Sequence, residues 1–134
     1  GYRSIAFLLF SFFPTFRKVM KIASPLICRD PEFPQMMDRD LSKTTLESFL
    51  ISIATLRKTD LRHQIGQIQV PVMGMFGDRD NIVSPRQWKT LKDGLPQARI
   101  ERFKNAGHFI MLDEPRRFMD TLKDFLDATT GEQS

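Results

Sequence analysis

The pattern of hydrophobic and polar positions predicts alternating strands and helices in the second half of the chain. Residues 70–76 form a short apolar run, which is typical of a parallel strand with both faces covered. Residues 98–103 alternate polar and apolar side chains, as in a strand nearer a sheet edge. A helix is expected between them, and a last helix from Pro115, so residues 69–127 predict a βαβα module. The last helix has a single apolar face, formed by Phe118, Met119, Leu122, Phe125 and Leu126.

Local signals place the ends of the helix between the two strands. Ser84 suits the N-cap position, Pro85 fits the first turn, and Gln87 is spaced for a capping box. Gly94 is expected to take the left-handed conformation that ends a helix. Asp80 then lies in the loop between Gly77 and this helix.

The first part of the chain predicts a helix and then a strand. Residues 4–13 are helical in pattern, and residues 5–13 are apolar on almost every side, apart from Ser11. That run is shorter than the roughly 20 residues that a bilayer span needs. A signal peptide is the rival interpretation, but no small-x-small cleavage site follows closely, so we expect a helix buried on several sides. A proline follows at position 14, and residues 19–23 are expected to form a strand.

Residues 24–68 predict a proline-containing loop followed by one helix. Pro25, Pro31 and Pro34 disfavour a continuous helix at the start of this segment. A helix is expected over about residues 43–57, with Thr44 and Glu47 as its capping box. Its apolar positions are Leu46, Phe49, Leu50, Ile53 and Leu56. Such a face is usually packing, although it can also line an acyl or aromatic substrate pocket together with Met36 and Met37.

Composition fits one globular domain of ordinary size, with 41% apolar and 27% charged residues. The formal net charge is +4, and Arg17, Lys18 and Lys21 cluster. Because acids are plentiful from Asp30 onward and aromatic residues follow apolar patterns, a solvated basic surface is favoured over a nucleic-acid site. Cys28 is the only cysteine, so an internal disulfide is impossible, which fits a cytoplasmic protein. A semi-buried thiol is the ordinary interpretation of Cys28, against a nucleophile.

Two residues with catalytic chemistry each follow a strand. Asp80 comes after the first strand of the module, and His108 comes after the second, beyond a tight turn at Asn105-Ala106-Gly107. In open parallel sheets, ligands bind outside the carboxyl ends of the strands, so both side chains are expected at one crevice. Asp78 remains an alternative acid. Asp80 is also suited to capping its loop or pairing with an arginine, and His108 to a purely structural role.

The order and spacing of these motifs resemble the carboxyl-terminal part of the α/β-hydrolase fold. The matching residues are Pro71, Gly77, Asp80, Pro85, Ala106-Gly107-His108 and Glu114-Pro115. The resemblance implies a partial α/β-hydrolase domain over residues 1–134, with about three parallel strands flanked by helices and a short helical lid insertion. Residues 1–23 would be the helix and strand that follow the family's nucleophile elbow, and residues 24–68 would occupy the lid position. Residues 128–134 would be a flexible tail.

The resemblance also implies an activity for the complete protein. The family's elbow usually reads Gly-x-Ser-x-Gly, and none of the internal serines lies in that frame. Gly1 would be the last glycine of the elbow or the residue after it, with one oxyanion-hole donor near it. The family then implies serine-type ester or lactone hydrolysis, with His108 as the base and Asp80 as the acid that orients it. This chain alone would be inactive.

Other outcomes stay open at the level of sequence. Some members of the family use an aspartate nucleophile, others cleave carbon–carbon bonds, and some are noncatalytic, so an interaction module is the second hypothesis. The expected partners are a small ester-like substrate and either the missing amino-terminal half or a second copy that pairs with an open sheet edge. No membrane span and no nucleic-acid partner are expected, for the reasons given above. No metal or cofactor is expected either, because the sequence contains no convincing Gly-rich phosphate loop or Cys-His cluster. His63 lies in a polar connection, where a surface role is the default.

Overall fold

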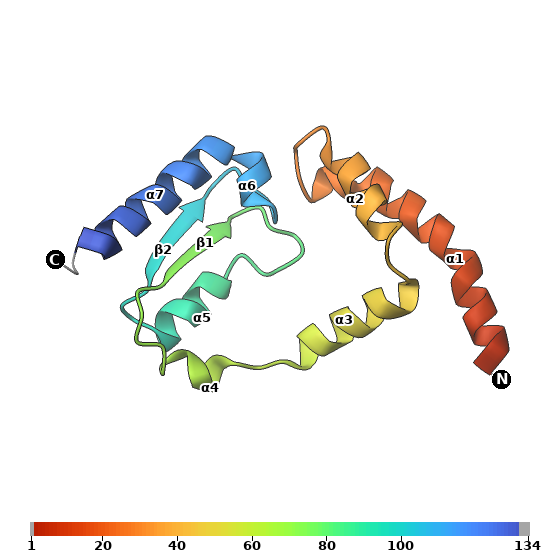
Figure 1. The fold of residues 1–134 in the computed structure, drawn as a ribbon, viewed down its shortest axis with the longest axis horizontal. Coiled ribbons are helices and arrows are strands. Elements are labelled where there is room, and N and C mark those ends of the chain that lie inside the picture. The colour runs from red at the N-terminus through yellow and green to blue at the C-terminus, as the bar shows by residue number, and fades with distance from the viewer. Residues whose placement is uncertain (1, 132–134) are drawn as a thin grey trace. The chain divides into compact units, whose positions relative to one another are not determined.

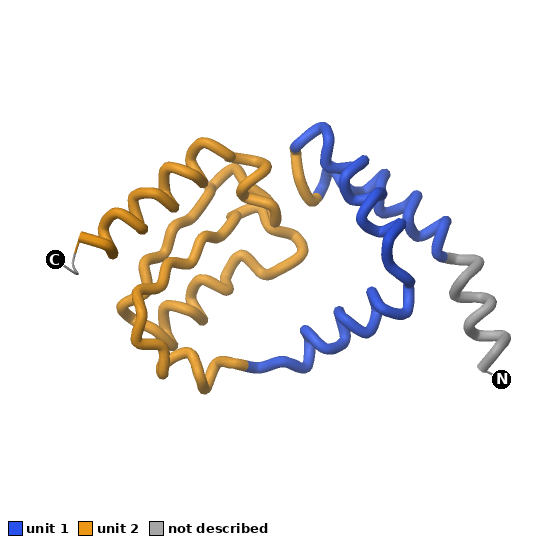
Figure 2. Tube along the Cα trace, in the orientation of Figure 1, with its two compact units in different colours: residues 1–26, 30–60 blue, residues 27–29, 61–134 orange. Residues whose placement is uncertain are grey.

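A computed structural model describes the backbone of residues 2–131 and the side chains of residues 13–131. The chain divides into two compact units (Figure 2). Unit 1 comprises residues 1–26 and 30–60, and unit 2 comprises residues 27–29 and 61–134. Each unit has its own packing.

Unit 1 is helical. Its elements are α1 (Tyr2–Ala23), the 3-10 turn η1 (Ser24–Leu26), α2 (Phe33–Leu41) and α3 (Leu46–Lys58). Arg17 of α1 forms an ion pair with Asp38 of α2, with 2.9 Å between Nη2 and Oδ1. The Phe16 ring lies 5.4 Å from the Phe49 ring, centroid to centroid, which packs α1 against α3.

The predicted strand at residues 19–23 is wrong, because this segment forms the last turns of α1 (Figure 1). Val19 and Ile22 are both exposed, Ile22 by 80%. A helix satisfies its backbone hydrogen bonds within the segment, whereas a strand needs a neighbour. Within the described residues no strand lies beside this segment, so the helix is the conformation in which its backbone N–H and C=O groups are hydrogen-bonded. Pro14, expected after the end of the first helix, lies inside α1.

Two further predictions for unit 1 need correction. Residues 33–41 were expected to be loop, but they form α2, because Pro34 occupies the first helical turn, where its missing N–H is tolerated. The next helix begins at Leu46 instead of residue 43. Its N-cap is Thr45, whose extended backbone lets its Oγ1 accept a hydrogen bond from the Ser48 N–H at 3.1 Å. The expected capping box from Thr44 is therefore wrong by one residue.

Unit 2 contains the βαβα module. Its elements are α4 (Arg62–Ile65), β1 (Met73–Gly77), α5 (Gln87–Gly94), β2 (Arg99–Phe103), α6 (Ile110–Asp113) and α7 (Pro115–Gly131). The two strands are parallel, in a register that pairs Met73 with Arg99 and Gly77 with Phe103. Within residues 2–131 the sheet has these two strands, fewer than the three expected from sequence.

Helices cover both faces of this sheet, with α5 on one side and α7 on the other (Figure 1). Side chains alternate along β1, which explains how it meets both helices. A Cβ added at Gly74 would lie 2.6 Å from Cδ2 of Leu91, so α5 packs directly on the strand there. The next residue, Met75, packs with the core cluster on the α7 side. That cluster comprises the buried residues Phe103, Ala106 and Ile110, and Phe118 of α7 also packs against it.

Helix ends in unit 2 differ slightly from the predicted ones. Helix α5 begins at Gln87, because Ser84 instead forms a turn in which its carbonyl accepts the Gln87 N–H at 3.0 Å. Gly94 is the last helical residue, and no described glycine has a left-handed φ. A Cβ at Gly94 would lie 3.3 Å from Cγ2 of Ile65, so the glycine allows α4 to approach α5. Helix α7 continues to Gly131, so residues 128–131 of the predicted tail are helical.

Some expectations fall outside the described residues. These are the elbow and oxyanion role of Gly1, the burial of the side chains at positions 5–12, and the last three residues of the tail. Among the described residues, no helix combines the length and apolar character required to cross a bilayer.

Candidate functional site

The site is built where two loops leave the carboxyl ends of β1 and β2. Backbone hydrogen bonds continue past the strands and tie these loops together: Asp78 N–H donates to Phe103 O, and Arg79 N–H donates to Ala106 O, both at 3.0 Å. Gly77 is buried between them. A Cβ at this position would meet the carbonyl oxygens of Ala106 and Gly107, so glycine permits the close approach of the two loops.

The tied loops bring Asp80 and His108 into contact. Oδ2 of Asp80 lies 2.9 Å from Nδ1 of His108. The other carboxylate oxygen, Oδ1, accepts hydrogen bonds from the Ile82 N–H at 2.8 Å and the Val83 N–H at 2.9 Å. The side chain of Asp80 is 14% exposed and that of His108 is 33% exposed. The acid is therefore largely enclosed, while the imidazole keeps access to a reactant.

Electrostatics decide which way the proton lies in this pair. Partial burial alone raises the pKa of Asp80, but hydrogen bonds from Val83, His108 and Ile82, together with the charge of His108, outweigh burial and hold its pKa below the ordinary value of 3.8. At neutral pH the carboxylate is ionised and can only accept, so we assign the donor proton to His108 Nδ1. In the neutral ring, Nε2 is then the nitrogen that can accept a proton.

The neighbouring acid has a different partner. Asp78 forms a two-point ion pair with Arg102, at 2.9 Å from Nε to Oδ1 and 3.0 Å from Nη2 to Oδ2. Arg79 donates to Asn105 Oδ1 at 3.3 Å, a second link between the two loops. Of the two acids that the sequence offers, Asp80 is thus the one bonded to His108. Asp80 also caps its own loop through the Ile82 and Val83 N–H groups while it contacts His108, so the capping role and the contact with the histidine hold together.

Asp113 is a site residue that the sequence analysis missed. Its Oδ2 accepts a hydrogen bond from the N–H of Gly107, directly before His108, at 2.7 Å. Its Oδ1 accepts the Arg29 N–H at 2.7 Å and lies 3.5 Å from Sγ of Cys28. No local pattern in the sequence relates this acid to Gly107 or Arg29, so the sequence offered no signal for it. Cys28 itself is 2% exposed, which is poorly suited to attack on a substrate.

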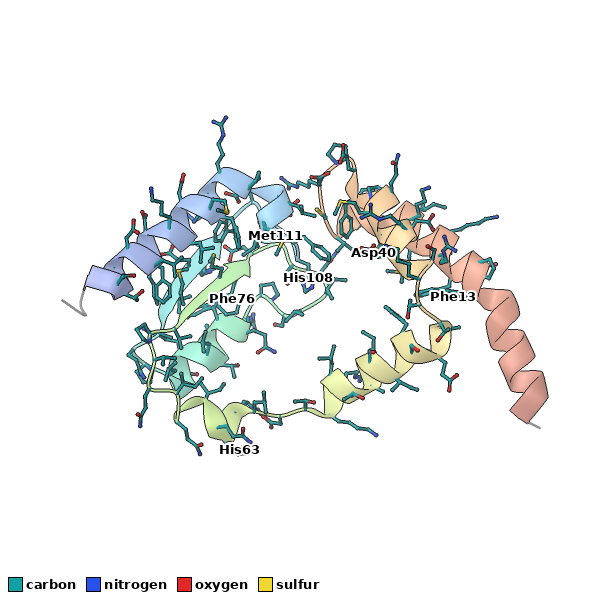
Figure 3. All side chains as sticks on the ribbon, viewed as in Figure 1. Phe13, Asp40, His63, Phe76, His108 and Met111 are labelled. Atoms are coloured by element: carbon teal, nitrogen blue, oxygen red, sulfur yellow. The ribbon has the colours of Figure 1, made fainter. Side chains whose placement is uncertain are left out.

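His63 does not join this site. It lies on α4, exposed, with its Nε2 3.1 Å from Nε2 of Gln64. Figure 3 shows it at the far end of unit 2 from His108, which lies near Phe76 and Met111. In the part of the chain that the structure describes, no three histidine, cysteine or acidic side chains are grouped so as to hold a metal ion.

The arrangement has the chemistry of a general base. A carboxylate holds one imidazole nitrogen, and the other nitrogen can take a proton from a hydroxyl or a water and return it. The same arrangement orients the histidine in catalytic triads on several unrelated folds. A triad also needs a nucleophile, and the 134 residues contain no Gly-x-Ser-x-Gly motif.

Comparisons with known proteins show that the chain is similar to hydrolases. It is 32% identical over 80 residues to a pimeloyl-[acyl-carrier protein] methyl ester esterase of Photobacterium profundum, covering 60% of this chain and 32% of that protein. It is also 32% identical over 85 residues to a putative carbamate hydrolase RutD of Pseudomonas savastanoi, covering 63% of this chain and 32% of that protein. The chain thus spans about a third of the length of these relatives.

Structural similarity covers more of the chain. An esterase from Exiguobacterium antarcticum matches 93% of this chain and 48% of its own, with a TM-score of 0.75 and 21% identity, which supports the fold. The model of the family described as the alpha/beta hydrolase fold matches residues 30–115, a range that includes β1, β2, Asp80 and His108. The chain belongs to the α/β-hydrolase fold family.

Proposed function

We propose that this chain supplies the acid and the histidine of a serine-type hydrolase that cleaves esters or lactones. The observation that carries the proposal is the 2.9 Å contact between Asp80 Oδ2 and His108 Nδ1, placed at the carboxyl ends of two parallel strands. His108 is the general base in this proposal, and Asp80 orients it and stabilises its protonated form. Asp78 is set aside as the acid because it is paired with Arg102.

The proposed nucleophile is a serine on a glycine-framed elbow outside these 134 residues. None of the serines in the chain has the required glycines two positions away on either side. The chain is therefore proposed to act as the carboxyl-terminal part of the hydrolase and to be inactive alone. Residues encoded ahead of Gly1 would carry the elbow, in the order nucleophile, acid, histidine that this fold uses.

The proposed reaction has two stages. His108 Nε2 takes the proton of the serine hydroxyl as its oxygen attacks the acyl carbon, and gives that proton to the leaving alcohol as the ester bond breaks. Water then attacks the acyl-enzyme with His108 again as base, releasing the carboxylic acid and the serine. An ester substrate is favoured because one relative is a methyl ester esterase.

The test is hydrolysis of a short-chain p-nitrophenyl ester by the chain alone, by the polypeptide encoded ahead of it, and by their mixture. We expect p-nitrophenol release only in the mixture. His108→Ala should abolish the activity that depends on the chain, and Asp80→Asn should reduce it on the order of 10⁴-fold, as expected when the imidazole loses its orienting acid. His63→Ala is the matched control and should retain full activity, since His63 lies away from the site.

Two outcomes would overturn the proposal. Hydrolysis by the chain alone would show that the nucleophile lies within the 134 residues. Equal activity of the mixture with the wild-type chain and with His108→Ala would show that the histidine is not the base.

A noncatalytic binding role is the second candidate. It is favoured by the exposed apolar side chains of α3, among them Leu50, Ile51 and Leu56. Exposed groups of this kind often mark contact surfaces for other proteins. Absence of ester hydrolysis in every mixture, together with a stable complex between the two polypeptides, would favour this role. For either role we propose a cytoplasmic location, on the basis of the single buried cysteine.

A further inference from the structure

The turn that carries His108 is held by one carboxylate from α6. Asp113 Oδ2 accepts the Gly107 N–H at 2.7 Å, so the residue before the histidine is fixed by a charge-assisted hydrogen bond. The same side chain holds the segment 27–29 through the Arg29 N–H at 2.7 Å. These contacts lie within unit 2.

The segment on the other side of this carboxylate lies directly against the turn. A Cβ added at Gly107 would come within 2.6 Å of the Ile27 carbonyl oxygen and 3.4 Å of Asp113 Oδ2. Gly107 is buried. Asp113 thus joins two backbone segments that are distant in sequence, and Gly107 lies close to both its carboxylate and the Ile27 carbonyl.

We propose that Asp113 is a positioning residue, which fixes the Gly107 backbone so that His108 Nδ1 faces Asp80. The inference rests on the proposed function of His108 as a base. Asp113 acts on the reaction through the direction of the imidazole, without contact to the substrate. Two acidic side chains then hold one histidine, Asp80 through its ring and Asp113 through the backbone of the preceding residue.

A positioning role for Asp113 follows from the geometry of the contact between Asp80 and His108. The contact of Asp80 with His108 is a single hydrogen bond to one ring nitrogen. Its geometry therefore depends on the position and direction of the His108 backbone, from which the side chain extends. Without Asp113, the Gly107 N–H loses its acceptor, and the turn can rotate to find another. A displacement of about 1 Å in a catalytic group can cost on the order of 10²-fold in rate.

Two variants alter this carboxylate to different degrees. Asp113→Ala removes both acceptor oxygens. Asp113→Asn keeps the shape of the side chain but replaces one oxygen by an NH₂ group, which would face an N–H donor. Asp120→Asn is the matched control, because it removes the same charge from an exposed position on α7.

The first readout uses the 134-residue chain and needs no activity. Ring ¹⁵N NMR of His108 reports which nitrogen carries the proton when the imidazole is neutral. We expect protonated Nδ1 in the wild-type chain and in Asp120→Asn. In Asp113→Ala we expect the tautomer population to shift toward protonated Nε2, while the backbone signals of β1 and β2 are retained. In Asp113→Asn we expect a smaller shift in the same direction.

The second readout is ester hydrolysis in the two-polypeptide mixture. We expect kcat to fall on the order of 10²-fold in Asp113→Ala with KM little changed, because substrate binding does not involve this residue. A wild-type tautomer in both Asp113 variants would overturn the inference. The inference would also be overturned if the tautomer changed only in samples that had lost the backbone signals of the folded chain. Asp113 would then act by stabilising the fold and not by directing the imidazole.

The two proposals fail in different ways. A mixture that never hydrolyses the ester contradicts the proposed hydrolase, whereas the tautomer measurement still decides whether Asp113 directs the imidazole. A normal tautomer in the variants combined with an active mixture contradicts only the role of Asp113.

Discussion

At the scale of single residues, the site depends on positions where a side chain would prevent two loops from meeting. Gly77 ends β1 and lies against the carbonyl oxygens of Ala106 and Gly107. The hydrogen bonds from Asp78 to the end of β2 and from Arg79 to the loop after it require the same close approach. The glycine therefore matters for the distance between Asp80 and His108, although it has no chemistry of its own.

Replacing Gly77 by alanine is expected to destabilise the chain. The added methyl group would collide with backbone atoms, which cannot move aside as a flexible side chain can, and overpacking of this kind costs about 1–3 kcal/mol. The measurement is urea unfolding followed by the fluorescence of Trp88, the only tryptophan. Gly131→Ala is the control, since nothing lies within 4 Å of the Cβ position there. Equal stability of the two variants would contradict the assigned contact.

The lowered pKa of Asp80 predicts a dependence of stability on pH. Below 3.8 and down to the folded-state pKa, the unfolded chain binds more protons at this position than the folded chain, so acid favours unfolding. The stabilisation is present above 3.8 and is lost as pH falls through the folded pKa. We expect Asp80→Asn to be less stable than wild type at pH 7, with the difference in free energy of unfolding shrinking below 3.8. Urea unfolding across this range measures it, and a constant difference would contradict the pKa direction.

Sequence alone was sufficient to name Asp80 and His108, because each follows a short strand at a recognisable turn. It left Asp78 open as the acid, and the structure places that side chain on Arg102 instead. It did not reveal Asp113. The contacts of Asp113 with Gly107 and Arg29 join segments that no local pattern relates, so they become visible only in three dimensions.

At the scale of elements, helix α3 begins where one threonine side chain can cap it. The sequence offers Thr44 and Thr45 side by side, and local patterns favoured the first because Glu47 follows it at capping-box spacing. The backbone at Thr45 is extended, with φ −106° and ψ 155°, which lets its side chain turn back to the Ser48 N–H. The choice between adjacent caps was therefore a matter of backbone geometry.

Thr45→Ala is expected to weaken the start of α3, and Thr44→Ala is not. Loss of a threonine cap typically costs about 1 kcal/mol, because a backbone N–H loses its acceptor. Hydrogen exchange of the first-turn amides of α3 measures this directly. We expect faster exchange in Thr45→Ala alone, and faster exchange in Thr44→Ala alone would support the capping box that the sequence suggested.

The elements that the sequence predicted well are those with their own periodicity. Strands β1 and β2 and helix α7 were expected near their observed positions, because short apolar runs and a strong helical face are local signals. The conformation of residues 19–23 was not predicted correctly, since their few β-branched residues suit a helix or a strand. The outcome depends on whether a neighbouring strand is present. Helix α2 was not predicted, because prolines disfavour the interior of a helix. Pro34 instead lies in the first turn of α2, where proline is tolerated.

At the scale of the whole molecule, we expect the isolated chain to self-associate. Leu56 is 69% exposed on α3, a helix that also exposes Ile51 and Leu50, and among the described residues each strand has a partner on one side only. Sedimentation at increasing concentration should give masses above 15.6 kDa. Leu56→Asp should reduce association more than Thr55→Asp, which adds the same charge beside the apolar positions. A monomer with sharp thermal unfolding would contradict the expectation.

The most direct test of the central claim is covalent labelling of the proposed serine with a fluorophosphonate. The serine oxygen attacks phosphorus and fluoride leaves, while the hydroxyl proton passes to the base, so the labelling rate reports whether His108 activates a nucleophile. In a mixture of the two polypeptides, we predict that the label attaches to the polypeptide encoded ahead of Gly1. Labelling should become slower by a factor on the order of 10²–10⁴ with His108→Ala. Equally fast labelling without His108, or a label on the 134-residue chain itself, would contradict the account.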